Sequence, residues 1–594
     1  MRKVVFKKIV FYLRFVNSPT VYFLAFLSFL FSLPYLSPAF ATVDPLSVPN
    51  NKFGIHIIQA TPDESSPAAS LVNSSGGDWG YITFLIESKD RDENKWKEFF
   101  NDLRRRHLIP IVRLATKPLN AHWERPYEGE EQAWADFLDK LNWPTKNRYV
   151  IVYNEPNHAK EWGNKVDAKS YAKVLDQTIT ALKNKNRDFF VLNAGLDASA
   201  PQKLPEYQDQ LSFMREMEEV VPGIFNKLDG WASHSYPNPE FAGSPYAVGR
   251  GTIRTWIWEI QVLRSLGLTK DLPIFITETG WKHSEGIQIS PYLPSPETVA
   301  EYFKDAFNIA WSNPQIAAVT PFILSYQEYP FDHFSFKKLA SKSSLDPKLP
   351  FHPQYYEVQN LPKIKGSPIQ ENMAERTLGE IYSTIVAGQT YNIDLTFKNT
   401  GQSIWNDSPN QPVRLVPIQG GKELGIEEVV LLRDTKVEPW KEAVFNIKLN
   451  APLSGTFNIK LNLFSGDKQF DSKPLEFKTT VKHPVVLKIK SSLLWKKDAE
   501  GGYLLTVKGP TGEKTQSINL NSEGYSEESE AKHLLPDYVF EFELEKPYYL
   551  PKKLKQKVAT GVNLLDFNTL QPDIFTNLLN PKQLWNLLPW SNRQ

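Results

Sequence analysis

The chain contains no cysteine among its 594 residues. This absence excludes disulfides, iron–sulfur clusters, thiolate zinc sites and cysteine nucleophiles. The sequence also lacks an excess of charge of one sign, because 68 Lys and Arg against 67 Asp and Glu leave a net charge of +1. Without a basic surplus there is no electrostatic footprint for nucleic acid, and we expect no such partner. A His-Glu-x-x-His helix pattern is missing too, and we expect neither a catalytic metal nor another cofactor.

The N-terminus has the layout of an export signal. Basic residues precede an apolar segment at 21–36, and Ala39-Phe40-Ala41 supplies a small-x-small cleavage pattern. We therefore expect residues 1–41 to be a signal peptide and the body to be secreted, extracellular or held at the cell envelope. An uncleaved N-terminal anchor is the alternative, although the apolar segment is shorter than the roughly 20 residues that a membrane span needs.

Apolar, β-branched runs of strand length alternate with amphipathic segments over residues 50–345. The expected strands are Lys52–Ile58, Trp79–Ile86, Ile109–Leu114, Tyr149–Asn154, Phe189–Leu196, Leu228–Ser235, Pro273–Thr277 and Ala317–Leu324. The expected helices are Asn94–Arg106, Gln132–Leu141, Ala168–Lys183, Gln210–Val220, Arg254–Leu266 and Pro296–Trp311. This alternation predicts an α/β fold, specifically a (β/α)₈ TIM barrel. A doubly wound open sheet is the rival, but no Gly-rich nucleotide-binding turn follows the first strand.

The pattern changes after the barrel. Prolines crowd residues 346–370, which predicts a linker. Period-two alternation in residues 391–398 and 457–463 then predicts a β-sandwich over 371–484. Alternation recurs at 503–508 and 539–544, so we expect a second β-rich module with an irregular tail over 485–594.

Two glutamates end expected strands. Glu155 follows the apolar run from Tyr149 and precedes Pro156, and Glu278 follows the run from Pro273 and precedes Thr279-Gly280. Most glutamates are solvated surface residues, but in a barrel the C-terminal ends of the strands face the active site. Two carboxyl groups held there are what glycosidic cleavage needs. We therefore expect a poly- or oligosaccharide substrate, whose rings the abundant Trp and Tyr residues would suit.

The sequences Asn154-Glu155-Pro156 and Glu278-Thr-Gly-Trp281 resemble clan A glycoside hydrolases, the retaining (β/α)₈ enzymes that include cellulases, galactanases and xylosidases. The resemblance spans roughly residues 50–345. It implies that Glu155 is the acid/base, that Glu278 is the nucleophile and that Asn154 binds the sugar 2-hydroxyl. One departure is the absence of a Trp at the end of the eighth strand, where Phe322 or Tyr326 must substitute.

Other polar and aromatic residues follow strand ends. We expect substrate-site roles for His234, Tyr236, Arg113, His56, Trp162, Trp281 and Tyr326, with Trp123 as a further stacking residue. Core packing is the competing interpretation for each aromatic, and Trp281, three residues after Glu278, is the one we place in the cleft.

The expected sandwich carries Asn399-Thr-Gly401 followed by Trp405, which resembles an Ig-like module with an Asn-Thr-Gly…Trp signature. Such modules imply a spacer or adhesive role, so the C-terminal modules or an uncleaved N-terminus would attach the protein to the cell envelope. The sequence thus predicts a secreted retaining glycosidase acting on β-linkages. The alternative is a non-catalytic glycan-binding or adhesion protein built on a barrel scaffold.

Overall fold

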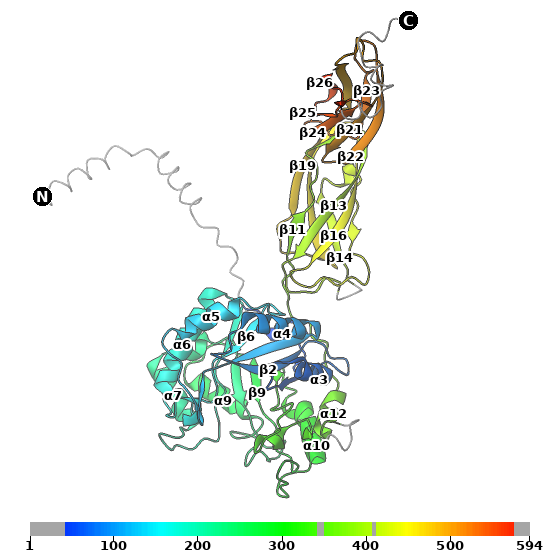
Figure 1. Ribbon diagram of the computed structural model, residues 1–594. Coiled ribbons are helices and arrows are strands. Elements are labelled where there is room, and N and C mark those ends of the chain that lie inside the picture. The colour runs from blue at the N-terminus through cyan, green and yellow to red at the C-terminus, as the bar shows by residue number, and fades with distance from the viewer. Residues whose placement is uncertain (1–41, 341–349, 407–410, 575–594) are drawn as a thin grey trace, which may run out of the picture. The chain divides into compact units, whose positions relative to one another are not determined.

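The computed structural model describes residues 42–340, 350–406 and 411–574, and the chain divides into two compact units, Met1–Ile369 and Gln370–Gln594 (Figure 1). The expected signal peptide or anchor lies outside the described residues. Within the described ranges, no helix combines the length and apolar character that a membrane crossing requires.

The first unit has strands surrounded by helices (Figure 1). Its main strands are β1 (Gly54–His56), β2 (Gly80–Glu87), β3 (Leu108–Ala115), β6 (Arg148–Ile151), β7 (Phe189–Leu192), β8 (Trp231–His234), β9 (Ile274–Glu278) and β10 (Ile316–Val319). Its helices are α3 (Pro62–Val72), α4 (Glu93–Arg105), α5 (Glu130–Asp139), α6 (Ala168–Lys185), α7 (Gln210–Val220), α8 (Ile224–Lys227), α9 (Thr255–Ser265), α10 (Pro296–Asp305) and α12 (Pro353–Asn360). A small hairpin, β4 (Pro118–Leu119) and β5 (His122–Trp123), follows β3. All eight predicted strands and all six predicted helices are therefore present, whereas α3, α8 and α12 were not predicted.

The main strands form two parallel sheets, in the orders β1-β2-β3-β6-β7 and β8-β9-β10. Isolated parallel bridges join the sheets at both edges, Phe53 with Val319 at one edge and Leu192 with Gly230 and Asp197 with His234 at the other. A cluster of buried side chains, among them Tyr81, Tyr149 and Phe275, draws on strands of both sheets. Because the strands are parallel, their carboxyl ends meet at one end of the unit.

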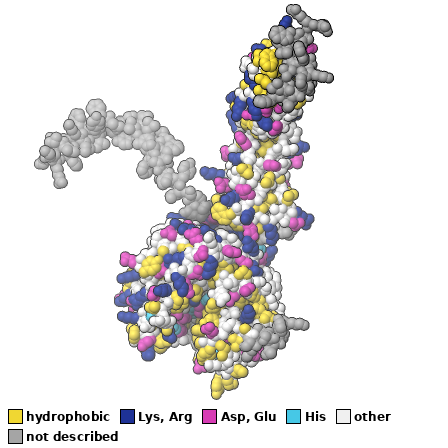
Figure 2. Space-filling view, in the orientation of Figure 1, with side chains coloured by type: hydrophobic (Ala, Val, Ile, Leu, Met, Phe, Trp, Pro, Cys, Tyr) yellow, Lys and Arg dark blue, Asp and Glu magenta, His cyan; other side chains and the backbone are white. Residues whose placement is uncertain are grey.

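Helix α6 illustrates how the outer layer forms. The Asp167 side chain caps its first turn by accepting the N–H of Ser170, and Lys183 and Lys185 lie in its last turn, where cations offset the helix dipole. Tyr171 and Leu175, four residues apart, are buried against the sheet. Figure 2 shows acidic and basic side chains interspersed over the visible face of this unit.

The predicted linker at 346–370 was wrong in part, because it contains α12. Its tyrosine Tyr355 is buried and donates a hydrogen bond of 2.8 Å to the carbonyl of Pro67 in α3. The chain then returns to the strands, where the Ile369 carbonyl accepts the N–H of Lys146 at 2.8 Å. One of the prolines that suggested a linker, Pro353, instead starts this helix, since it occupies the first helical position.

Strands dominate the described part of the second unit. They are β11 (Ala374–Leu378), β12 (Thr384–Val386), β13 (Thr390–Asn399), β14 (Val413–Gln419), β15 (Val429–Val430), β16 (Glu442–Asn450), β17 (Gly455–Ser465), β18 (Lys468–Gln469) and β19 (Leu475–Lys482), then β20 (Val485–Leu493), β21 (Gly501–Gly509), β22 (Gly512–Leu520), β23 (Ser529–Ala531), β24 (Val539–Glu545), β25 (Lys552–Lys557) and β26 (Gly561–Leu570). The sheets are β11-β13-β16, β12-β19-β17-β14-β15 with β18 beside β17, β23-β20-β26 and β22-β21-β24-β25. No sheet of the described residues combines strands from before and after His483. The first two sheets share one hydrophobic cluster, and the last two share another.

The Asn399-Thr-Gly401 turn lies beside the hydrophobic cluster that the first two sheets share. The buried Asn399 amide donates to the carbonyls of Ser403 and Val437 at 2.8 and 2.9 Å and accepts the N–H of Gly401 at 3.0 Å. These bonds fix the loop that delivers Trp405, which is buried in the cluster with its ring edge-on to Phe470. The motif therefore has a packing role in this protein.

Replacing Trp405 with Ala should lower the thermal unfolding temperature of the second unit, because the cavity costs about 3–5 kcal/mol. Trp405→Phe is the matched control: the indole N–H has no hydrogen-bond partner among the described residues, so the smaller ring loses little polar contact. Calorimetry should show the loss in one transition, with the transition of Met1–Ile369 unchanged. An equal shift of both transitions would contradict the division into two units.

Candidate active site

The carboxyl ends of five strands bring six polar side chains together. His56, His234 and Glu278 are the last residues of β1, β8 and β9, and Arg113 lies near the end of β3. Asn154 and Glu155 come three and four residues after the end of β6 at Ile151. This strand ends earlier than predicted, and Glu155 has a positive φ of 30°. Glu155 therefore projects from a turn beyond the strand.

Glu278 is the most heavily contacted member. Arg113 Nη1 donates to its Oε1 at 2.7 Å, and the hydroxyl of Tyr236 donates to its Oε2 at 3.1 Å. The Nδ1 atoms of His234 and His56 lie 3.7 and 3.8 Å from its two oxygens. The side chain is only 10% exposed. The Glu278 carboxylate is thus surrounded by two hydrogen-bond donors and two imidazole rings.

Glu155 faces Glu278 across a short gap. His234 Nδ1 lies 2.8 Å from Glu155 Oε1, and one oxygen of each glutamate and this nitrogen are all within 4.8 Å of one another. Glu155 makes no ion pair with Lys or Arg among the described residues. The two carboxyl groups thus share one pocket but have different surroundings.

Asn154 is held from both sides. Its Oδ1 accepts from Arg113 Nη1 at 2.7 Å, and its Nδ2 donates to Glu161 Oε2 at 3.2 Å. Arg113 therefore connects Asn154 to Glu278. The amide keeps a second N–H for another partner.

The electrostatics separate the two glutamates further. Burial by itself would raise the pKa of Glu278, but His234, Arg113 and the Tyr236 hydrogen bond together hold that pKa below its usual value. Burial also lowers the pKa of His56 to about 3, with Arg113 adding to the effect, so this imidazole is neutral. For His234, burial is outweighed by Glu278 and Glu155, which raise its pKa. Glu278 is therefore ionised in the free protein.

Three titratable groups near Glu155 were missed by sequence reasoning. His158 Nε2 lies 2.8 Å from Asp197 Oδ2, and its Nδ1 is 4.0 Å from Glu155 Oε2. Glu161 is the third, and burial together with the charge of Glu155 raises its pKa to about 7. His158 and Asp197 lie in loops and Glu161 ends a single 3-10 turn, where no periodic pattern marks a buried side chain.

Gly195 was also missed, and it makes room for His234. A Cβ added at this position would lie 2.1 Å from Cδ2 of the imidazole, closer than any real contact. Its carbonyl also accepts the N–H of Glu155 at 3.2 Å. A residue without a side chain is therefore needed for His234 to reach Glu155.

The predicted stacking roles of Trp281 and Trp162 were wrong. Trp281 is buried against Tyr302, Phe303 and Trp311, and its indole N–H donates to the Gly243 carbonyl at 2.7 Å. Trp162 is buried as well, with its ring against Tyr153 and Tyr171. An indole with no exposed face cannot stack on a sugar. The core interpretation holds for both.

The remaining aromatics are more accessible. Phe322 is half-buried and lies edge-on to His56 at 5.4 Å, so it occupies the expected position beside the site. Tyr326 lies one ring farther out, because it contacts Phe331, which in turn contacts Phe322. Trp123 is half-buried on the β4–β5 hairpin. Of the two expected substitutes for a strand-eight Trp, Phe322 is the nearer.

Glu155, His234 and Glu278 also have the donor types and spacing of a metal site. The Arg113 guanidinium, however, is 2.7 Å from Glu278 and competes with a cation for the same carboxylate. The arrangement therefore suits proton transfer and nucleophilic attack better than metal binding.

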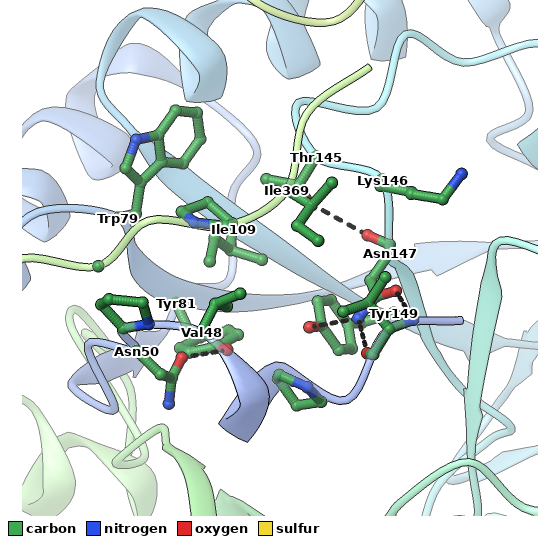
Figure 3. Close-up of a pocket in the computed structure, with 15 residues that line it drawn as sticks. Val48, Asn50, Trp79, Tyr81, Ile109, Thr145, Lys146, Asn147, Tyr149 and Ile369 are labelled. Carbon is green, nitrogen blue, oxygen red and sulfur yellow. Dashed lines mark hydrogen bonds between the residues drawn. The ribbon is translucent and has the colours of Figure 1, made fainter. Parts of the chain in front are cut away.

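A separate small cavity lies at the opposite ends of the strands (Figure 3). Tyr81, Ile109 and Tyr149, near the starts of β2, β3 and β6, line it together with Asn50 and Asn147. Its polar groups already bond to one another, since Tyr81 donates to Asn50 at 2.7 Å and Asn147 donates to Tyr149 at 3.0 Å. This cavity contains none of the residues described above.

No protein-family model and no curated protein matches the sequence. Similar solved structures include a family 39 glycoside hydrolase from Bacteroides cellulosilyticus WH2, with 14% identity over 68% of this chain and 82% of that chain and a TM-score of 0.37. A GH128 (subgroup II) endo-β-1,3-glucanase from Sorangium cellulosum has 15% identity over 52% of this chain and 97% of that chain, with a TM-score of 0.32. A family 51 α-L-arabinofuranosidase from Bifidobacterium longum has 11% identity over 72% and 98%, with a TM-score of 0.35. Because these TM-scores are below 0.5, the functional assignment rests on the site's own geometry.

The Glu161→Gln variant should be more stable than the wild type at pH 8 but not at pH 4. In the native state the pKa of Glu161 is about 7, so the carboxyl group keeps its proton until the pH approaches that value. In the unfolded chain its pKa has the ordinary value of 4.5. Wild-type stability therefore falls as pH rises from 4.5 to 7, and the neutral amide avoids this loss. For this half-buried group the gain at pH 8 should be roughly 2–3 kcal/mol. Denaturant unfolding at both pH values measures the difference in stability between the variant and the wild type. A gain in stability that is the same at both pH values would contradict the prediction.

Proposed function

We propose that this protein is a retaining glycoside hydrolase that cleaves β-glycosidic bonds in a poly- or oligosaccharide. The observation that carries the proposal is the pair of carboxyl groups with oxygens within 4.8 Å, one of them bound by Arg113 and Tyr236 and the other not. Retaining enzymes have carboxyl groups about 5–5.5 Å apart, whereas inverting enzymes need about 6.5–9.5 Å to fit a water. The short separation supports retention.

In the first step, ionised Glu278 attacks the anomeric carbon while Glu155 gives its proton to the leaving glycosidic oxygen. This forms a glycosyl ester on Glu278 and releases the free alcohol of the leaving sugar. In the second step, Glu155 takes a proton from water, the resulting hydroxide attacks the anomeric carbon, and the ester bond to Glu278 breaks. Both residues return to their starting states.

The neighbouring residues have supporting roles in this proposal. Arg113, Tyr236 and His234 keep Glu278 charged although it is buried, which a nucleophile requires. The second N–H of Asn154 is available for the sugar 2-hydroxyl. Neutral His56 and the ring of Phe322 form a wall of the sugar site.

The finer architecture and location belong to the same proposal. The isolated parallel bridges at both edges of the two sheets support a closed (β/α)₈ barrel. The paired sheets on either side of His483 support two sandwich modules, the first Ig-like, over 371–484 and 485–594. We further propose export by the N-terminal segment, with the C-terminal modules or an uncleaved N-terminus serving attachment to the cell envelope.

Replacing Glu278 with Gln should lower turnover by roughly 10³-fold or more, because the neutral amide cannot attack carbon. Release of reducing sugar from cellulose, mannan, xylan and galactan, and of phenol from aryl β-glycosides, provides the measurement. Glu155→Gln is the matched variant. It should lose most activity on the polysaccharides but little in the first step on substrates whose leaving group needs no proton.

Two controls separate the proposal from its rivals. Dialysis against EDTA should leave activity unchanged, since no metal step is involved. Glycan binding by the wild type without any sugar release would instead support the non-catalytic binding or adhesion protein.

A further inference from the structure

Glu161 is a third carboxyl group beside the catalytic pair. It ends a short 3-10 helix, Ala159–Glu161, in the loop that follows Glu155. The charged and titratable groups that face it are Glu155, Glu278, Arg113 and His158. Among the described residues, Glu161 makes no salt bridge with Lys or Arg. Its side chain is thus turned toward the active site without the cation that usually accompanies a structural glutamate.

The hydrogen bonds of Asn154 show what this carboxyl group can do. The amide oxygen accepts from Arg113 and one amide N–H donates to Glu161, so the two contacts agree on a single orientation of the amide. A side-chain amide can otherwise rotate by half a turn and exchange its oxygen and nitrogen. Arg113 can only donate, so it excludes the exchanged amide, but its single contact at the oxygen leaves the amide plane free to pivot about that hydrogen bond. The second hydrogen bond, to Glu161, fixes the amide plane, and the remaining N–H of Asn154 then points in one direction.

Building on the proposed glycosidase function, we propose that Glu161 is a positioning residue that fixes the Asn154 amide so that its free N–H binds the sugar 2-hydroxyl. Glu161 itself does not contact the reacting atoms. Its effect on catalysis passes through Asn154 and therefore depends on the presence of the 2-hydroxyl in the substrate.

Burial and the charge of Glu155 raise the pKa of Glu161 to about 7. Both protonation states keep a carbonyl-type oxygen that can accept from Asn154, and the ionised form accepts the stronger bond. Glu161→Gln retains such an oxygen, whereas Glu161→Ala removes it. The two variants thus separate the hydrogen bond from mere occupation of space.

The test compares each variant on an aryl β-glycoside that the wild type cleaves and on its 2-deoxy analogue, at one pH. Glu161→Ala should lower kcat/KM by about 10- to 100-fold on the parent substrate, the size expected for a lost hydrogen bond to a polar group. On the 2-deoxy substrate the loss should be less than about threefold, and Glu161→Gln should stay within about threefold of the wild type on both. Equal losses on the two substrates would overturn the proposal, because a merely structural residue affects both alike.

A crystal structure of Glu161→Ala gives a second answer that does not depend on turnover. The Asn154 side chain should leave its bond with Arg113 or rotate, whereas an unchanged amide overturns the proposal. If the wild type cleaves none of the glycosides, the glycosidase assignment fails. The orientation of Asn154 in the crystal still decides the role of Glu161.

Discussion

The contact between Arg113 and Glu278 is the interaction on which the rest of the site depends. A carboxylate as buried as Glu278 would ordinarily hold its proton, because low dielectric disfavours charge. The guanidinium at 2.7 Å, with the Tyr236 hydroxyl and the His234 imidazole, reverses this preference. The same guanidinium also holds the oxygen of Asn154. The charge on the proposed nucleophile and one of the two hydrogen bonds that hold the Asn154 amide thus come from one side chain.

These side chains can meet in one pocket because the strands of the fold run in parallel. Residues distant in the chain, from His56 to Glu278, reach one pocket since the strands of both sheets end on the same side. The exact placement of Glu155 is then set by the turns that follow the strands. The positive φ of Glu155 and the missing side chain at Gly195 together let the acid/base candidate meet His234.

Much of this could be predicted from the sequence. Continuous apolar runs predicted all eight strands, and the abrupt change to Asn154-Glu155 and to Glu278 indicated where two of them present carboxyl groups. The roles of Trp281 and Trp162 were predicted wrongly because closeness to a strand end does not determine which way an indole points. Trp281 turns toward α10 and fills the core. Glu161, His158 and Asp197 could not be found, since their meeting depends on loop conformations that leave no periodic signal. The predicted linker failed at α12 because Pro353 begins a helix as readily as it interrupts one.

The proposed double displacement requires Glu278 to form a covalent bond to the sugar during turnover. The most direct measurement is proton NMR of the first product formed from a β-linked substrate, recorded before mutarotation. Double displacement predicts that the β-anomer appears first and the α-anomer follows by mutarotation. An α-anomer formed first would show a single displacement by water and would contradict the assignment of Glu278 as nucleophile.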